Sequence, residues 1–168
     1  MAPKAAAPFN LGDALVQAWD VNERMNQFLL EHLDERVWQA EPPPGHGRTI
    51  AAIFAHMHNV RHMWLVVSAK DKPAPPKVDR AKVTIKQAQA ALAKSAIAMR
   101  DLLATGVVHP QGRIKDFPPG VAGFFGYAVS HEAHHRGQIC SLTRQLGHRL
   151  PDDVSYGMWD WKARQKEI

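Results

Sequence analysis

The chain has 168 residues, 45% of them hydrophobic and 22% charged, which predicts one globular domain over residues 1–168. No apolar run approaches the ~20 residues that cross a bilayer, and the start of the chain lacks the apolar core of a signal peptide, so we expect a cytoplasmic protein with no membrane partner. The net charge of +5 lies mainly in residues 70–100, where eight Lys and Arg and two Asp and Glu occur without an aromatic residue; this favours a solvated helix face over a nucleic-acid interface.

Two segments in the first half of the chain have helical periodicity. The first covers about residues 11–33, where apolar side chains recur every three or four positions, and the Pro-rich stretch at 41–47 follows it. The second begins after Thr49, a residue type that is favoured as an N-cap. Its predicted core stripe consists of Ile53, His56, Val60, Met63 and Val67.

Two further helical segments lie in the second half. The third covers about residues 84–104 and is predicted to end at Gly106. The fourth covers about residues 121–146 and is predicted to end at Gly147. The apolar stripe of this fourth helix consists of Phe124, Ala128, His131, His135, Ile139, Leu142 and Leu146.

Strand signals are nearly absent, so the predicted fold class is all-α: a single four-helix bundle with long connections between its helices. Connections of this length can run back along a helix, which allows crossover topologies. We expect a short flexible N-terminus at about residues 1–9 and a C-terminal tail at about 148–168. An apolar helix face that remains unpaired, with Trp19 or Trp38 at its edge, is expected to form a homodimer.

Three histidines lie on the predicted core stripes, where an unpaired polar group costs about 1–3 kcal/mol. His131 and His135 are four residues apart, so on a helix they share one face and can bind one cation together. His56 holds a stripe position of another helix. The single cysteine, Cys140, excludes a multi-cysteine site, so metal ligands must be nitrogen and oxygen atoms. A lone core histidine is more often satisfied by a carbonyl or water, but three together predict one bound divalent metal ion.

Other histidines compete for this role. His58 and His62 are also four apart, but they lie about 200–240° around the helix from His56, so we expect them at the surface or between subunits. His134 points about 100° away from His135, toward a flank. The remaining histidines stand alone near helix ends or in loops and are expected to have no such role: His32, His46, His109 and His148.

Residues 131–135 also match H-E-x-x-H, the zinc protease pattern in which the glutamate is the general base. The extended patterns fail, because Gln138 and Ser141 stand where a glycine and a third histidine are required, and only Glu167 remains as a downstream glutamate. Protease chemistry is therefore not expected, and we expect Glu132 to flank the metal site instead.

Two sequence runs carry a family resemblance. The fourth segment contains SHEAHHRGQICSLTRQLG, in which an H-x-x-x-H pair is followed by R-G-Q and later by L-G. The second contains TIAAIFAHMHNVRHMWL, in which a histidine follows small apolar residues and precedes an aromatic residue by about eight positions. In both runs the chain resembles the DinB-like family of helical bundle proteins. The resemblance explains Gly137, which costs about 1 kcal/mol inside a helix, as a close-packing point.

The resemblance implies a four-helix bundle, commonly dimeric, in which three histidines bind a divalent metal ion, often zinc or nickel. Carried over position by position, the ligands are His56, His131 and His135, the same three that the core stripes select. Some members of the family are thiol transferases that act with low-molecular-weight thiols, others are hydrolases or isomerases, and many have no known reaction. The fold alone does not transfer any of these activities.

Three neutral imidazoles leave at least one coordination position open, as in a catalytic site. We therefore expect a metal-dependent transferase or hydrolase that activates water or a small thiol and acts on a small-molecule substrate. Pocket candidates are Gln138, Arg136, Glu132 and Trp64; Gln138 is expected nearer the site, and for Arg136 a surface salt bridge is the alternative. Cys140 is expected to be a small buried filler. The alternative functions are a non-catalytic metal-binding or oligomerising bundle and, third, a basic nucleic-acid binder.

Overall fold

The computed structural model describes residues 8–44 and 47–168. This part of the chain is all-helical, as predicted, and none of its helices has both the length and the hydropathy that a membrane crossing requires. Residues 1–7 of the N-terminus that we expected to be flexible lie outside the described residues, as does His46. The helices are α1 (Leu11–Glu31), α2 (Glu35–Trp38), α3 (Ile50–Ser68), α4 (Ile85–Val108), α5 (Gly120–Gln145), α6 (Asp152–Gly157) and α7 (Trp161–Lys166).

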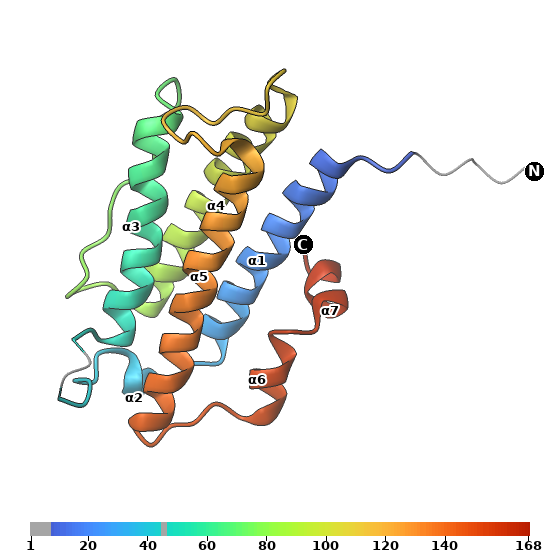
Figure 1. Ribbon diagram of the computed structural model, residues 1–168. Coiled ribbons are helices and arrows are strands. Elements are labelled where there is room, and N and C mark those ends of the chain that lie inside the picture. Colours follow the sequence, from blue (N-terminus) through green and yellow to red (C-terminus); the bar gives the residue numbers. More distant parts are fainter. Residues whose placement is uncertain (1–7, 45–46) are drawn as a thin grey trace, which may run out of the picture.

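The four long helices lie side by side, with α1 and α5 running in one direction and α3 and α4 in the other (Figure 1). Helix α4 packs against α1 and α3, and α5 contacts all three of the others. The connection between α3 and α4 runs back along α3, where the Asn59 side chain bonds both the N–H and the carbonyl of Val78 at 3.0 Å. This crossover lets two consecutive helices point the same way.

Polar side chains fix where the helices begin. Thr49 accepts a hydrogen bond from the N–H of Ala52 at 3.1 Å, so the predicted N-cap is confirmed. Thr84 and Gln87 form a reciprocal capping box at the start of α4. Asn10 caps α1, since its side chain accepts hydrogen bonds from the N–H groups of Gly12 and Asp13. These caps fix the first turns of α1, α3 and α4, whereas α5 begins after Pro119 without a side-chain cap.

A layer of buried polar side chains divides the core into two apolar clusters. One cluster includes Phe54 and Ile139, and the other includes Trp19 and Phe124. On each long helix the polar positions lie between the two clusters in sequence. We call these residues the polar layer: Asn22 and Asn26 on α1, His58 and Arg61 on α3, Ser95 on α4, and Glu132 and Arg136 on α5.

The predicted core stripe of the second helix is wrong in part. Met63 is 43% exposed, whereas Phe54, Arg61 and Leu65 are buried. Helix α3 carries apolar residues around much of its circumference, because other helices and the connection to α4 pack against it from several sides. Apolar periodicity then does not select one face. His56 consequently lies half-buried at the edge toward α5 and not at the centre of the core.

Two predictions about glycines are also wrong. Gly106 does not end the third helix but is buried within α4, where an added Cβ would lie 2.5 Å from Ile114 Cδ1. Gly137 is not a close-packing point, because it is exposed and an added Cβ would meet no atom within 4 Å. Close approach between elements occurs instead at Gly106 and at Gly12, where an added Cβ would overlap Val107 Cγ1.

Both tryptophans expected at the edge of an unpaired face are buried. The indole N–H of Trp19 donates to the Ala96 carbonyl at 3.0 Å, and that of Trp38, in the unforeseen short helix α2, donates to the Val83 carbonyl at 2.7 Å. Trp19 is 0% and Trp38 6% exposed, so neither ring is available to a second copy of the chain at an unpaired face; the homodimer itself stays a prediction. The C-terminal segment contains α6 and α7, of which α7 packs against α1.

Candidate metal centre

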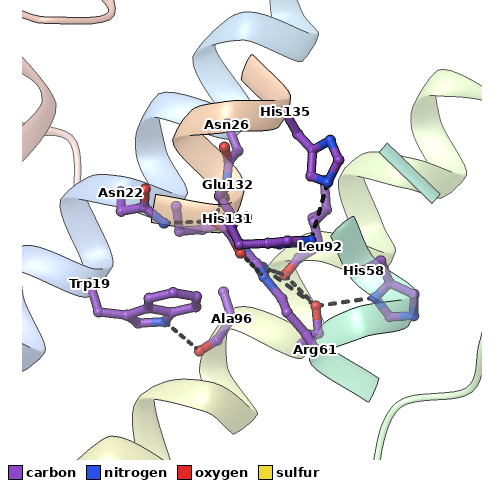
Figure 2. Close-up of polar contacts among 12 residues, drawn as sticks. Trp19, Asn22, Asn26, His58, Arg61, Leu92, Ala96, His131, Glu132 and His135 are labelled. Atoms are coloured by element: carbon purple, nitrogen blue, oxygen red, sulfur yellow. Dashed lines mark hydrogen bonds and ion pairs between the residues drawn. The ribbon is translucent and has the colours of Figure 1, made fainter. Parts of the chain in front are cut away.

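Three histidine side chains from two helices meet beside the polar layer. His131 and His135 lie about one turn apart on α5, and His56 lies on the neighbouring α3. The Nε2 atom of His131 is 3.3 Å from Nε2 of His56 and 3.1 Å from Nε2 of His135; Figure 2 shows the second contact. Each of the three residues offers a ligand atom within 4.8 Å of the others.

The spacing of these nitrogen atoms fits the ligands of one cation. Two imidazole nitrogens bound at about 2.0–2.1 Å to a tetrahedral zinc ion are about 3.3 Å apart, close to the observed distances. Hydrogen bonding accounts for the cluster less well, because a ring nitrogen has either a proton or one lone pair, while His131 Nε2 faces two other ring nitrogens. The three side chains could therefore hold a divalent metal ion.

Two polar neighbours act on the outer ring nitrogens. Gln138 Oε1 can only accept, so the Nδ1–H of His135 donates to it at 2.7 Å and the lone pair of His135 stays on Nε2. At the other histidine, Arg80 Nη2 donates to His56 Nδ1 over 3.4 Å. Because that contact leaves the proton of neutral His56 on Nε2, a metal ion at Nε2 requires Arg80 to release the ring.

All three imidazoles favour the neutral form that binds metals. Burial, followed by the charges of His135 and Arg48, lowers the pKa of His56 to about 4. Burial and the neighbouring His135 also lower the pKa of His131. For His135, burial lowers the pKa against the opposing hydrogen bond to Gln138. Protons therefore compete weakly with a metal ion for these nitrogens at neutral pH.

An aromatic cluster borders the site on one side. The ring of Tyr127 lies nearly parallel to His131, with centroids 6.0 Å apart. Trp64 packs edge-on against Tyr127 and Phe117, with centroids 5.6 and 5.4 Å apart. The indole N–H of Trp64 is buried and has no hydrogen-bond partner among residues 8–44 and 47–168. Trp64 thus supports the His131 side of the site through Tyr127.

A cavity of about 470 Å³ opens on the other side of His135. Its lining is mainly polar and includes the side chain of Gln138, whose oxygen holds the His135 ring. The lining residues are Gly47, Arg48, Ile53, His134, His135, Gln138, Ser141, Leu142 and Gln145. A small molecule in this cavity would contact His135 directly.

Glu132 is turned into the core. Its carboxylate accepts hydrogen bonds from Arg61 at 2.6 and 2.9 Å, from Asn22 at 2.6 Å and from Asn26 at 2.8 Å (Figure 2). Burial alone would raise the pKa of Glu132, but Arg61 holds it below its ordinary value. With both oxygens engaged in the core, Glu132 is not placed as the general base of a zinc protease.

Arg136 is buried, so the surface salt bridge that was its alternative is wrong. Its guanidinium donates to the side-chain oxygens of Asn22 at 2.9 Å and Asn26 at 2.7 Å. Burial lowers its pKa. Cys140, four residues further along α5, is partly buried at the edge of the apolar cluster, and burial raises the pKa of its thiol. Neither side chain contacts the three histidines.

The expectation that His58 lies at the surface or between subunits is wrong. Its ring is buried in the polar layer, with Nδ1 3.1 Å from Ser95 Oγ and Nε2 2.8 Å from the Pro76 carbonyl oxygen. His62 Nδ1 lies 2.7 Å from the Pro75 carbonyl oxygen. The connection between α3 and α4 therefore supplies a carbonyl partner for one ring nitrogen of each histidine.

Sequence reasoning missed two arginines near the site. The sequence predicts no role for Arg61, yet this residue is 2% exposed and pairs with Glu132 and Glu23. A signal existed, because Arg61 lies on the face of α3 that carries Phe54 and Leu65. Arg48 precedes an N-cap, and no sequence pattern indicates that it borders the cavity.

In the comparison with protein families, residues 8–166 match the DinB family. Comparisons with curated proteins and with solved structures gave no significant match. The matched segment includes both helices of the candidate metal centre and all three of its histidines. The chain therefore belongs to the DinB family.

Proposed function

We propose that this protein is a metal-dependent enzyme in which His56, His131 and His135 bind one divalent metal ion, zinc or nickel, within a DinB-like four-helix bundle. The observation that carries the proposal is the meeting of three Nε2 atoms from two helices. Family membership supports it, because the motif positions that the family resemblance selects are the same three residues.

Three protein ligands leave a coordination position for a substrate. When bound, the cation supplies Lewis-acid chemistry that lowers the pKa of water or of a small thiol at that position. The residues of the chain orient the ligands: Gln138 holds the His135 ring through Nδ1, and Tyr127 packs beside His131. These contacts prepare the site without rearrangement of α5.

The cavity beside His135 favours catalysis over the non-catalytic alternative. A structural metal site is closed by four protein ligands, whereas this one has three histidines and a cavity large enough for a small substrate. The supported reactions are transfer of a small thiol to an electrophile and hydrolysis, and both need the open position.

Cobalt provides the test, because Co²⁺ substitutes for zinc and its visible spectrum reports its ligands. Protein loaded with Co²⁺ should change its spectrum when a small thiol such as mercaptoethanol is added. His62→Ala, on α3 but outside both the ligand set and the cavity lining, should respond like the wild type. A cobalt-loaded protein whose spectrum does not respond to thiols would support a closed, non-catalytic site. Turnover assays on the zinc-loaded protein, with thiol acceptors and with esters, then separate a transferase from a hydrolase.

A further inference from the structure

The cavity beside His135 carries a positive charge without a balancing acid. Arg48 lines it together with His134 and Gln138. Among the residues that the structure describes, no Asp or Glu lines this cavity, and Arg48 takes part in none of the ion pairs. A guanidinium has five donors and no acceptor, so Arg48 can still bind an anion.

Some arginines of the chain have acidic partners, whereas Arg48, like Arg80, Arg113 and Arg144, joins none of the ion pairs among the described residues. Arg24 pairs with Glu31 at 2.8 Å, and even the exposed Arg100 pairs with Asp20 at 3.1 Å. Arg48 is exposed as well, but in the described part of the chain the cavity that it lines contains no acid: the other lining residues are polar side chains, imidazoles, Gly47, Ile53 and Leu142. The cavity is thus mainly polar, and Arg48 gives it a positive charge.

A second arginine adds positive charge on the opposite side of the histidines. Arg80 Nη2 lies 3.4 Å from His56 Nδ1. The acid adjacent in sequence to His131, Glu132, is bound by Arg61 and two asparagines in the core. A bound metal ion would displace Arg80 from the His56 ring, which leaves Arg48 and the cation as the positive groups beside the cavity; charge complementarity then favours an anionic ligand over a neutral or cationic one.

We propose that the substrate of this site is a small polar molecule with an oxyanion group, which Arg48 binds while the reactive end of the molecule lies beside His135. This inference rests on the proposed function and names its substrate class. Arginine binds oxyanions through two parallel N–H donors, which gives orientation as well as affinity. Gln138, Ser141 and Gln145 line the same cavity and offer hydrogen bonds to the rest of the molecule. Arg48 is thus a specificity-determining residue.

Four thiols of similar length test the inference on the Co²⁺-loaded protein: mercaptopropionate, mercaptoethanesulfonate, neutral mercaptopropanol and cationic cysteamine. The readout is the thiolate-to-cobalt absorbance at each thiol concentration. We expect both anionic thiols to bind at least about tenfold more tightly than mercaptopropanol, and cysteamine to bind most weakly. Because a sulfonate group is a poor metal ligand, tighter binding of mercaptoethanesulfonate than of mercaptopropanol cannot arise from chelation of the cobalt ion. If only mercaptopropionate binds more tightly, the substrate carries a carboxylate. If both anionic thiols bind equally tightly, the site accepts any oxyanion.

Variants of Arg48 separate its role from that of the metal charge. Arg48→Gln should reduce the preference for anionic over neutral thiols by about tenfold with unchanged metal content, and Arg48→Lys should retain part of it. Arg113→Gln, in the connection between α4 and α5, should behave like the wild type. Equal binding of anionic and neutral thiols, an Arg48→Gln variant that keeps the full preference, or no thiol binding by metal-loaded protein would overturn this inference and leave the metal site standing. Failure to bind any metal would overturn the proposed function and the inference with it.

Discussion

Gln138 decides which nitrogen of His135 is available to a metal ion. Its side-chain oxygen accepts a hydrogen bond from the Nδ1–H of His135 at 2.7 Å, which leaves the lone pair on Nε2 toward His131. Outer partners of this kind contribute about 10–100-fold to metal affinity. We expect Gln138→Leu to weaken zinc binding by about that factor in competition with a chelator. Gln145→Leu lies on the same helix without this contact and should keep the wild-type affinity; an unchanged Gln138→Leu would argue against the orienting role.

Gly137 offers a stability prediction at the same scale. It lies inside α5, is exposed, and has open space where a Cβ would be added. Gly137→Ala should therefore raise the free energy of unfolding by about 0.5–1 kcal/mol through helix propensity and a less flexible unfolded chain. Urea denaturation measures this. Gly106→Ala should gain less, because its Cβ would lie 2.5 Å from Ile114 Cδ1; the reverse order would contradict the packing described.

The polar layer is what fixes α5 relative to α1 and α3. Arg61 on α3 pairs with Glu132 on α5 at 2.6 Å and with Glu23 on α1 at 2.7 Å, and the arginine side chain is 2% exposed. Arg61→Ala would leave Glu132 charged and buried, so we expect a loss of about 3–5 kcal/mol in the free energy of unfolding. The exposed pair of Arg100 gives the control, since Arg100→Ala should cost about 1 kcal/mol or less. Similar losses for both variants would contradict a buried network.

The long helices show which features the sequence predicts and which it does not. Helix bounds follow from caps and apolar repeats, so the starts at Thr49 and Thr84 are predictable. The pairing of His131 with His135 follows from helical periodicity alone. The burial of Arg61 and His58 does not, because it depends on partners 71 and 37 positions away in the chain. The cavity was also out of reach, since the chain segment before α3 forms its wall at Arg48.

At the scale of the whole molecule, a bound metal ion would join α3 to α5. Any ligand that binds only the folded chain stabilises it, by about 2.7 kcal/mol at a free concentration 100-fold above Kd. We expect zinc to raise the thermal unfolding midpoint and a chelator to lower it again. His62→Ala, whose ring bonds a loop carbonyl, should keep this zinc response. A midpoint that does not respond to zinc in wild-type protein would mean that the three histidines do not bridge the helices.

The central claim is that His56, His131 and His135 are the ligands of one metal ion, and elemental analysis of purified variants tests it most directly. After metal loading and removal of excess metal, wild type and His134→Ala should each contain about one equivalent of zinc or nickel per chain. Three variants should contain far less, because each lacks one of the three converging nitrogens: His56→Ala, His131→Ala and His135→Ala. Full metal content in the three ligand variants, or its loss in His134→Ala, would contradict the site.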